Sequence, residues 1–62
     1  MEILSWKNQT KERYVVLAWN NAVHSFMYLD KAIRWCRHWL PKYGVLEIYD
    51  MQLQMVVWNW IY

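Results

Sequence analysis

The chain has 62 residues, of which 58% are hydrophobic and 19% are aromatic, and its formal net charge is +2. This length predicts a single domain, residues 1–62, and so small a charge gives by itself no reason to expect a nucleic acid partner. The single cysteine, Cys36, excludes an internal disulfide and suits a reducing compartment, so we expect a cytoplasmic protein. No apolar run approaches the roughly 20 residues of a membrane span, and the N-terminus lacks a signal-peptide pattern, so we expect no membrane association.

The N-terminal half of the chain predicts β-structure. Residues 2–7 indicate a short strand at the start of the chain. Residues 13–19 and 22–28 are rich in Tyr, Val and other apolar residues, and they predict the two strands of a hairpin. We expect the turn at Asn20-Asn21, because asparagine tolerates the positive φ that two-residue hairpin turns require.

Residues 29–43 predict an amphipathic helix, because apolar residues recur there at spacings of three and four. The apolar stripe consists of Leu29, Ala32, Ile33, Cys36, Trp39, Leu40 and Tyr43. Asp30 is expected to be the N-cap, and Gly44 is expected to end the helix. Pro41 removes a backbone donor, so we expect a regular helix over residues 31–40 and an irregular segment from there to its end.

The C-terminal part of the chain predicts two more strands, at residues 45–50 and 53–61. A turn at residues 50–52 makes them a hairpin, although a single long bent strand is the alternative, since no Gly or Pro separates them. The whole pattern predicts an α+β fold in the order β-β-β-α-β-β. Its antiparallel sheet has four to five strands, and one helix packs on one face of it.

The apolar excess of the sheet predicts a protein interface. One helix covers one face of the sheet, and alternation along the strands leaves the other face apolar as well. We take Leu53, Met55, Val57 and Ile61 as the helix-facing set of the last strand. The exposed partner interface is then formed by Tyr14, Val16, Tyr49, Val56, Trp58, Trp60 and Tyr62. The alternative is a sheet that curls into a partial barrel and buries these side chains on itself.

The helix carries a second candidate surface, which is basic. Lys31, Arg34, Arg37, His38 and Lys42 lie on its polar side, and no acidic residue follows Asp30 on the helix. Such a strip suits nucleic acid or an acidic protein, and its simplest alternative is an ordinary solvated face. Trp35 is the aromatic residue that we expect near this strip, and the sheet aromatics are expected on the opposite side of the domain. That separation argues against binding of single strands, which combines cations and aromatic platforms on one surface.

These patterns predict a binding protein and no enzyme. Cys36 and His38 are two residues apart on a helix and diverge by roughly 200°, so they cannot share a metal or form a nucleophile–base pair. No paired carboxylates or glycine-rich loop suggest catalysis, a cofactor or a metal site. We expect a small protein-interaction module that forms a homodimer through its aromatic sheet face and acts as an adaptor or inhibitor of a larger protein. The first alternative is a nucleic-acid-binding regulator that uses the basic helix face, and the second is a small-molecule binder with an aromatic-lined cavity.

Overall fold

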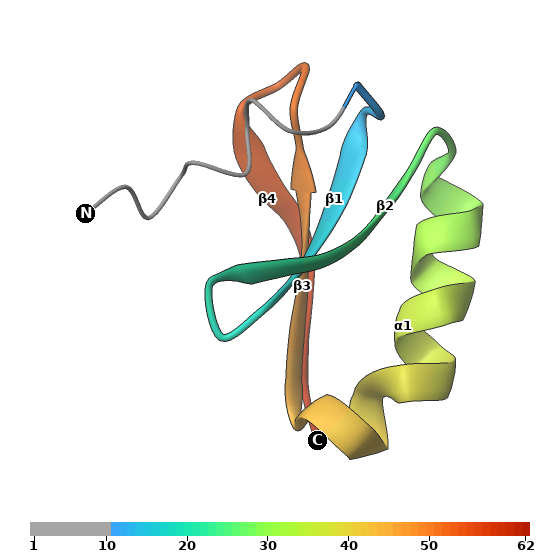
Figure 1. The fold of residues 1–62 in the computed structure, drawn as a ribbon, viewed down its shortest axis with the longest axis vertical. Helices are drawn as coiled ribbons and strands as arrows, with labels where there is room; N and C mark the ends of the chain where they lie inside the picture. The colour runs from blue at the N-terminus through green and yellow to red at the C-terminus, as the bar shows by residue number, and fades with distance from the viewer. Residues whose placement is uncertain (1–10) are drawn as a thin grey trace.

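Residues 11–62 are described by a computed structural model, in which a four-stranded antiparallel sheet packs against one helix (Figure 1). The elements in chain order are β1 (Tyr14–Ala18), β2 (Asn21–Phe26), α1 (Leu29–Tyr43), β3 (Val45–Asp50) and β4 (Met55–Ile61). The strands are ordered β2-β1-β3-β4 across the sheet, so β2 and β4 are its edges. The α+β class and the antiparallel sheet with one helix are confirmed, whereas the strand expected at residues 2–7 lies outside the described residues.

The turn between β1 and β2 lies one residue earlier than the sequence predicted. Trp19 and Asn20 have φ values of 53° and 68°, and Ala18 pairs with Asn21 across the turn. Both central residues therefore have positive φ, as a type I′ hairpin turn requires. The side chain of Asn21 donates a hydrogen bond to the Trp19 carbonyl at 3.2 Å, and this contact stabilises the turn from the next position.

Two expectations for the helix are wrong and a third is confirmed. The helix begins at Leu29 after Tyr28, so Asp30 lies inside the first turn, where its charge favours the helix dipole without capping a backbone group. The helix also continues through Pro41 to Tyr43, although proline has no backbone N–H to donate there. Gly44 ends the helix with a φ of 83°, and its N–H donates to the Leu40 carbonyl at 2.8 Å.

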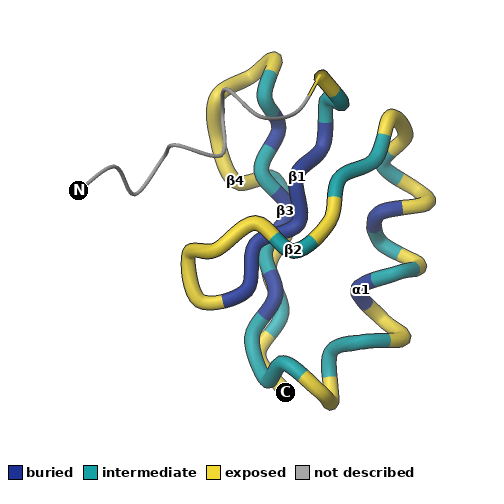
Figure 2. Tube along the Cα trace, in the orientation of Figure 1, coloured by how far each residue is buried: buried dark blue, intermediate teal, exposed yellow. Residues whose placement is uncertain are grey.

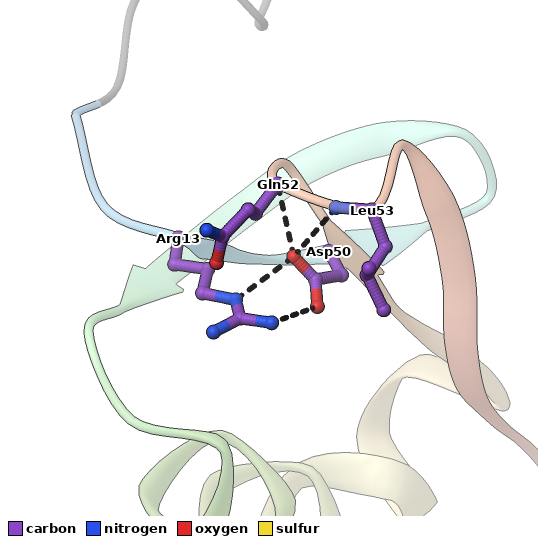
Figure 3. Close-up of polar contacts among 4 residues, drawn as sticks. All are labelled: Arg13, Asp50, Gln52 and Leu53. Carbon is purple, nitrogen blue, oxygen red and sulfur yellow. Dashed lines mark hydrogen bonds and ion pairs between the residues drawn. The ribbon is translucent and has the colours of Figure 1, made fainter.

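The β3–β4 connection is a hairpin rather than one bent strand, and Asp50 organises its turn (Figure 3). Asp50 Oδ1 accepts hydrogen bonds from the backbone N–H groups of Gln52 at 2.8 Å and Leu53 at 3.2 Å. The same oxygen accepts from Arg13 Nε at 3.0 Å, and Oδ2 accepts from Arg13 Nη2 at 2.9 Å. The Asp50 carboxylate thus joins the turn to the start of β1.

The main core lies between the sheet and α1. Its buried residues are Tyr14, Val16, Ala18, Ala32, Cys36, Leu46 and Ile48. A smaller apolar cluster lies on the other face of the sheet, where Val15 and Leu17 pack with Tyr49 and Met51. Figure 2 shows that burial is concentrated in β1, in β3 and on the inner side of α1, whereas both hairpin turns are exposed.

Each edge strand contains a β-bulge that changes the alternation of its side chains. Between β1 and β2 the register shifts so that Val23 is the extra residue, and between β3 and β4 the extra residue is Val57. In a regular strand, residues two apart lie on the same face of the sheet. A bulge between two such residues puts them on opposite faces. The two bulges therefore decide which aromatic side chains lie on the helix side of the sheet.

Candidate functional site

The structure divides the predicted sheet interface between both faces of the sheet. Tyr14 and Val16 lie under α1 and are 9% and 0% exposed, so the expectation that they form an open surface is wrong. Tyr49 is half-buried on the opposite face, where it packs with Val15 and Leu17. The predicted interface residues of β1 thus belong to the core under α1, whereas the predicted interface residue of β3 lies on the other face of the sheet.

The remaining predicted interface residues come from β4, and the bulge at Val57 explains where they lie. Trp58 pairs with Ile48 and Trp60 pairs with Leu46, two core residues under α1, so both tryptophans lie on the helix side of the sheet. Val56 pairs with Tyr49 and therefore lies on the opposite face. The expectation that Val56, Trp58 and Trp60 all lie on one face, away from the helix, is wrong.

Of the residues expected in the helix-facing core of the last strand, Val57 does pack against the core. The other three, Leu53, Met55 and Ile61, are exposed. The helix packs mainly over β1, β2 and β3, so it leaves the helix side of β4 uncovered. Trp58 is accordingly 45% exposed although it lies on the same side as the core, and Trp60 packs partly against the core beside it.

The β4 surface, defined as Val56, Trp58, Trp60 and Tyr62, is the first candidate site. The Trp58 and Trp60 rings lie 5.6 Å apart between centroids and are tilted by 32°, so they form one aromatic unit. Tyr62 is 78% exposed just beyond the strand, where its N–H donates to the Gly44 carbonyl at 2.8 Å. That bond fixes the end of β4 to the end of α1.

The second candidate site is a pocket between α1 and β2, which we call the α1–β2 pocket. It has a volume of about 480 Å³ and is lined by Phe26, Lys31, Arg34, Trp35, His38 and Trp39. Three of the five predicted basic residues therefore share a concave surface with aromatic rings. Arg37 does not line this pocket, and Lys42 lies beside it with Nζ 5.3 Å from the centroid of the Trp39 ring.

The aromatic part of this pocket was largely missed from the sequence. Trp35 contacts Phe26 with ring centroids 6.3 Å apart and Trp39 at 5.9 Å. The expectation that cations and aromatics lie on opposite sides of the domain is thus wrong for this group. The spacing of Trp35 and Trp39, one helical turn apart beside the basic strip, was the signal that could have found it.

Outside these two surfaces, the structure shifts the pKa values of Cys36 and Asp50. No three of the described His, Cys, Asp and Glu side chains lie close enough together to hold a metal ion. Cys36 is fully buried, and burial raises the pKa of its thiol to about 11. Arg13 holds the pKa of Asp50 below its usual value through their hydrogen bonds. Both groups therefore contribute to the fold.

Residues 11–62 form a small α+β domain in which β4 is an edge strand and an aromatic–cationic pocket lies at the opposite edge of the sheet. Comparison of the chain with protein-family models, with curated proteins and with solved structures found no match. None of the helices formed by residues 11–62 is both long enough and apolar enough to cross a membrane.

Proposed function

We propose that this protein is an interaction module that associates with a second copy of itself through β4. The observation that carries the proposal is the uncharged edge of the sheet. From Met55 to Tyr62 the chain contains no charged residue and no proline. Edge strands of monomeric proteins are usually protected by charges, by proline or by being short, because their unpaired backbone groups can bind another strand.

Among residues 11–62, no strand pairs with the outer side of β4, and the proposed partner strand would bind its backbone donors and acceptors. A second β4 in antiparallel register would continue the sheet about a two-fold axis, which is the commonest symmetry of soluble dimers. With that axis perpendicular to the sheet, the Trp58–Trp60 units of both copies lie on the same side. The bulge at Val57 limits how far the two strands can pair, so the dimer relies on these side chains as well as on backbone hydrogen bonds.

The size of the aromatic unit supports a second copy as the partner. A fully covered aromatic side chain buries about 150–250 Å², so four indoles contribute at most roughly 600–1,000 Å². A specific interface buries about 1,200–2,000 Å² in total, and Met55, Val56 and Tyr62 can supply part of the remainder. Tryptophan and tyrosine are also the residues whose truncation most often weakens an interface.

The test is the molar mass by light scattering of the wild type and of Trp58→Lys at about 100 µM protein, a concentration at which dimers with micromolar Kd form. We expect a dimer for the wild type and a folded monomer for the variant. Trp58 is chosen because Trp60 packs against the core, so its replacement would also destabilise the fold. Tyr28→Lys is the control, because Tyr28 is 63% exposed in the β2–α1 connection, at the other edge of the sheet from β4, and should leave the dimer intact.

A monomeric wild type would overturn the proposal. So would a Trp58→Lys variant that keeps the wild-type mass while Tyr28→Lys becomes monomeric, because the association would then use the β2 edge of the sheet. If β4 instead takes a strand from a larger protein, the wild type stays monomeric alone, and self-association through this edge is equally refuted.

A further inference from the structure

The α1–β2 pocket combines two chemical features that the dimer proposal does not use. Its aromatic walls come from Phe26 on β2 and from Trp35 and Trp39 on α1. Its cations, Lys31 and Arg34, come from the first half of the same helix and are exposed. No acidic side chain is among the described residues that line the pocket, so its field is positive.

The two cations are available for a ligand. Within residues 11–62, the ion pair of the structure joins Arg13 to Asp50, and neither Lys31 nor Arg34 has an acidic partner there. The aromatic rings of the pocket contact one another, so they do not need a ligand to order them. His24 stacks on Phe26 at 4.5 Å and meets the edge of Trp35 at 5.3 Å, so the pocket wall is fixed before binding.

A flat apolar wall beside unpaired cations suits an aromatic ring that carries an anionic group. The volume of about 480 Å³ lies within the usual range of roughly 300–1,000 Å³ for small-ligand sites. A nucleotide has both parts, because every base has a π face and every phosphate accepts hydrogen bonds from Lys or Arg. Arg34 in particular can bind two phosphate oxygens at once through its planar guanidinium group.

The cations extend beyond the pocket along the helix, and this favours a strand over a free nucleotide. Lys31 and Lys42 bound a basic strip of about 16 Å at 1.5 Å of rise per residue. A phosphorylated side chain would instead need cations that converge on one point. A duplex is disfavoured, because its bases are stacked inside and cannot reach the pocket rings.

We propose that the α1–β2 pocket binds single-stranded nucleic acid, with one base among Phe26, Trp35 and Trp39 and the neighbouring phosphates on Lys31 and Arg34. The pocket lies at the β2 edge of the sheet and the β4 surface lies at the other edge, so the two sites can be occupied independently. A β4-mediated dimer would carry two such pockets.

The binding test uses fluorescence anisotropy of a fluorescein-labelled oligothymidylate of 12 nucleotides with the full chain. Two phosphate contacts, on Lys31 and Arg34, predict that log K falls with log salt at a slope of about −1.4, which weakens binding roughly 7-fold between 50 and 200 mM salt. The fluorescence of the pocket tryptophans should be quenched as the base stacks. The unlabelled single strand should compete, whereas a 12-base-pair duplex should compete at least about tenfold less well because stacking is lost.

The matched pair of variants is Arg34→Glu and Arg37→Glu, which make the same charge change at two exposed positions of one helix. Arg34 lines the pocket and Arg37 does not. We expect Arg34→Glu to weaken binding about tenfold or more at 50 mM salt, and Arg37→Glu to weaken it less than about threefold. Phe26→Leu keeps an apolar side chain but removes the ring, and it should cost about fivefold or more.

Equal losses for Arg34→Glu and Arg37→Glu would overturn the proposal, because the affinity would then reflect net charge. Equal competition by the duplex, or by thymidine monophosphate at the same nucleotide concentration, would also overturn it. Trp58→Lys should bind the oligonucleotide with the same affinity per chain as the wild type, because its pocket is unchanged. A monomeric wild type would therefore leave the nucleic-acid proposal intact. A failure to bind the oligonucleotide would likewise leave the dimer proposal intact.

Discussion

Replacement of Asp50 by asparagine tests the polar contact that joins the β3–β4 turn to the start of β1. Asn has the shape of Asp, and its one oxygen can keep the three hydrogen bonds that Oδ1 accepts from Arg13 Nε and from the N–H groups of Gln52 and Leu53. Its amide nitrogen then stands where Oδ2 accepts from Arg13 Nη2 at 2.9 Å, so two donors face each other. The variant loses a charge-assisted hydrogen bond in a side chain that is 1% exposed.

Hydrogen bonds to charged groups stabilise a fold by about 1.5–3 kcal/mol each, so we expect Asp50→Asn to lower the free energy of unfolding by about 2 kcal/mol. A domain of this size rarely has more than roughly 3–5 kcal/mol of stability. A loss of 1 kcal/mol shifts the Tm of a small domain by about 4–8 °C, so the Tm should fall by roughly 8–16 °C. Thermal unfolding followed by circular dichroism at pH 7 measures it.

The pH dependence provides an independent check. The Arg13 hydrogen bonds lower the pKa of folded Asp50 below the usual value of the unfolded chain. Its contribution to stability is therefore present above the unfolded pKa, near pH 4, and is lost as the pH falls through the lower folded pKa. The gap in Tm between the wild type and Asp50→Asn should narrow in acid. Asp30→Asn, an exposed change in the first turn of α1, is the control and should cost less than about 1 kcal/mol. Equal Tm values at pH 7 for wild type and Asp50→Asn would refute the reasoning.

Two further predictions concern buried and strained positions. Cys36 is 0% exposed and burial raises its pKa to about 11, so a disulfide exchange reagent at pH 7.5 should label it only as fast as the chain opens; labelling at the rate of a free thiol would place Cys36 elsewhere. Gly44→Ala should lower the free energy of unfolding by about 1–2 kcal/mol, because φ is 83°, while Gly44→Asn should cost less. Chemical denaturation compares the two, and an alanine variant as stable as the wild type would contradict the conformational argument.

The helix could be predicted from the sequence because its signal is local. Leu29, Ala32 and Cys36 repeat with the helical period, and Gly44 marks the end of the pattern, so one segment of chain contains all the information. The strands at 45–50 and near the C-terminus were likewise predicted from local composition. The start of the helix was misplaced because Asp30 is a good N-cap residue that lies in the first turn instead.

The faces of the sheet could not be predicted, because they depend on the pairing of β1 with β3 as well as on two single-residue bulges. Val15 pairs with Tyr49 in a regular register, so Tyr14 and Val16 lie on the opposite face from Tyr49. Nothing in the sequence around Val23 or Val57 distinguishes an extra residue from an ordinary strand position, yet each bulge changes the side on which its neighbours lie. Val56, Trp58 and Tyr62 of the predicted interface are nevertheless exposed, while Trp60 packs partly against the core and Tyr14 and Val16 belong to it. The dimer itself stays a prediction. The α1–β2 pocket required the packing of β2 against the helix, which brings Phe26 to Trp35 from nine residues away in the chain.

The pairing of β1 with β3 has a consequence for how the domain folds. Each hairpin is local, so β1–β2 and β3–β4 can form early without closing a long loop. Their only strand-to-strand connection among the described residues is the antiparallel pairing from Tyr14↔Asp50 to Leu17↔Glu47. That pairing closes a loop that contains β2 and α1, so we expect it to form after the two local hairpins. The boundary between β1 and β3 is then the place where we expect the two hairpins to join during folding and to separate during unfolding.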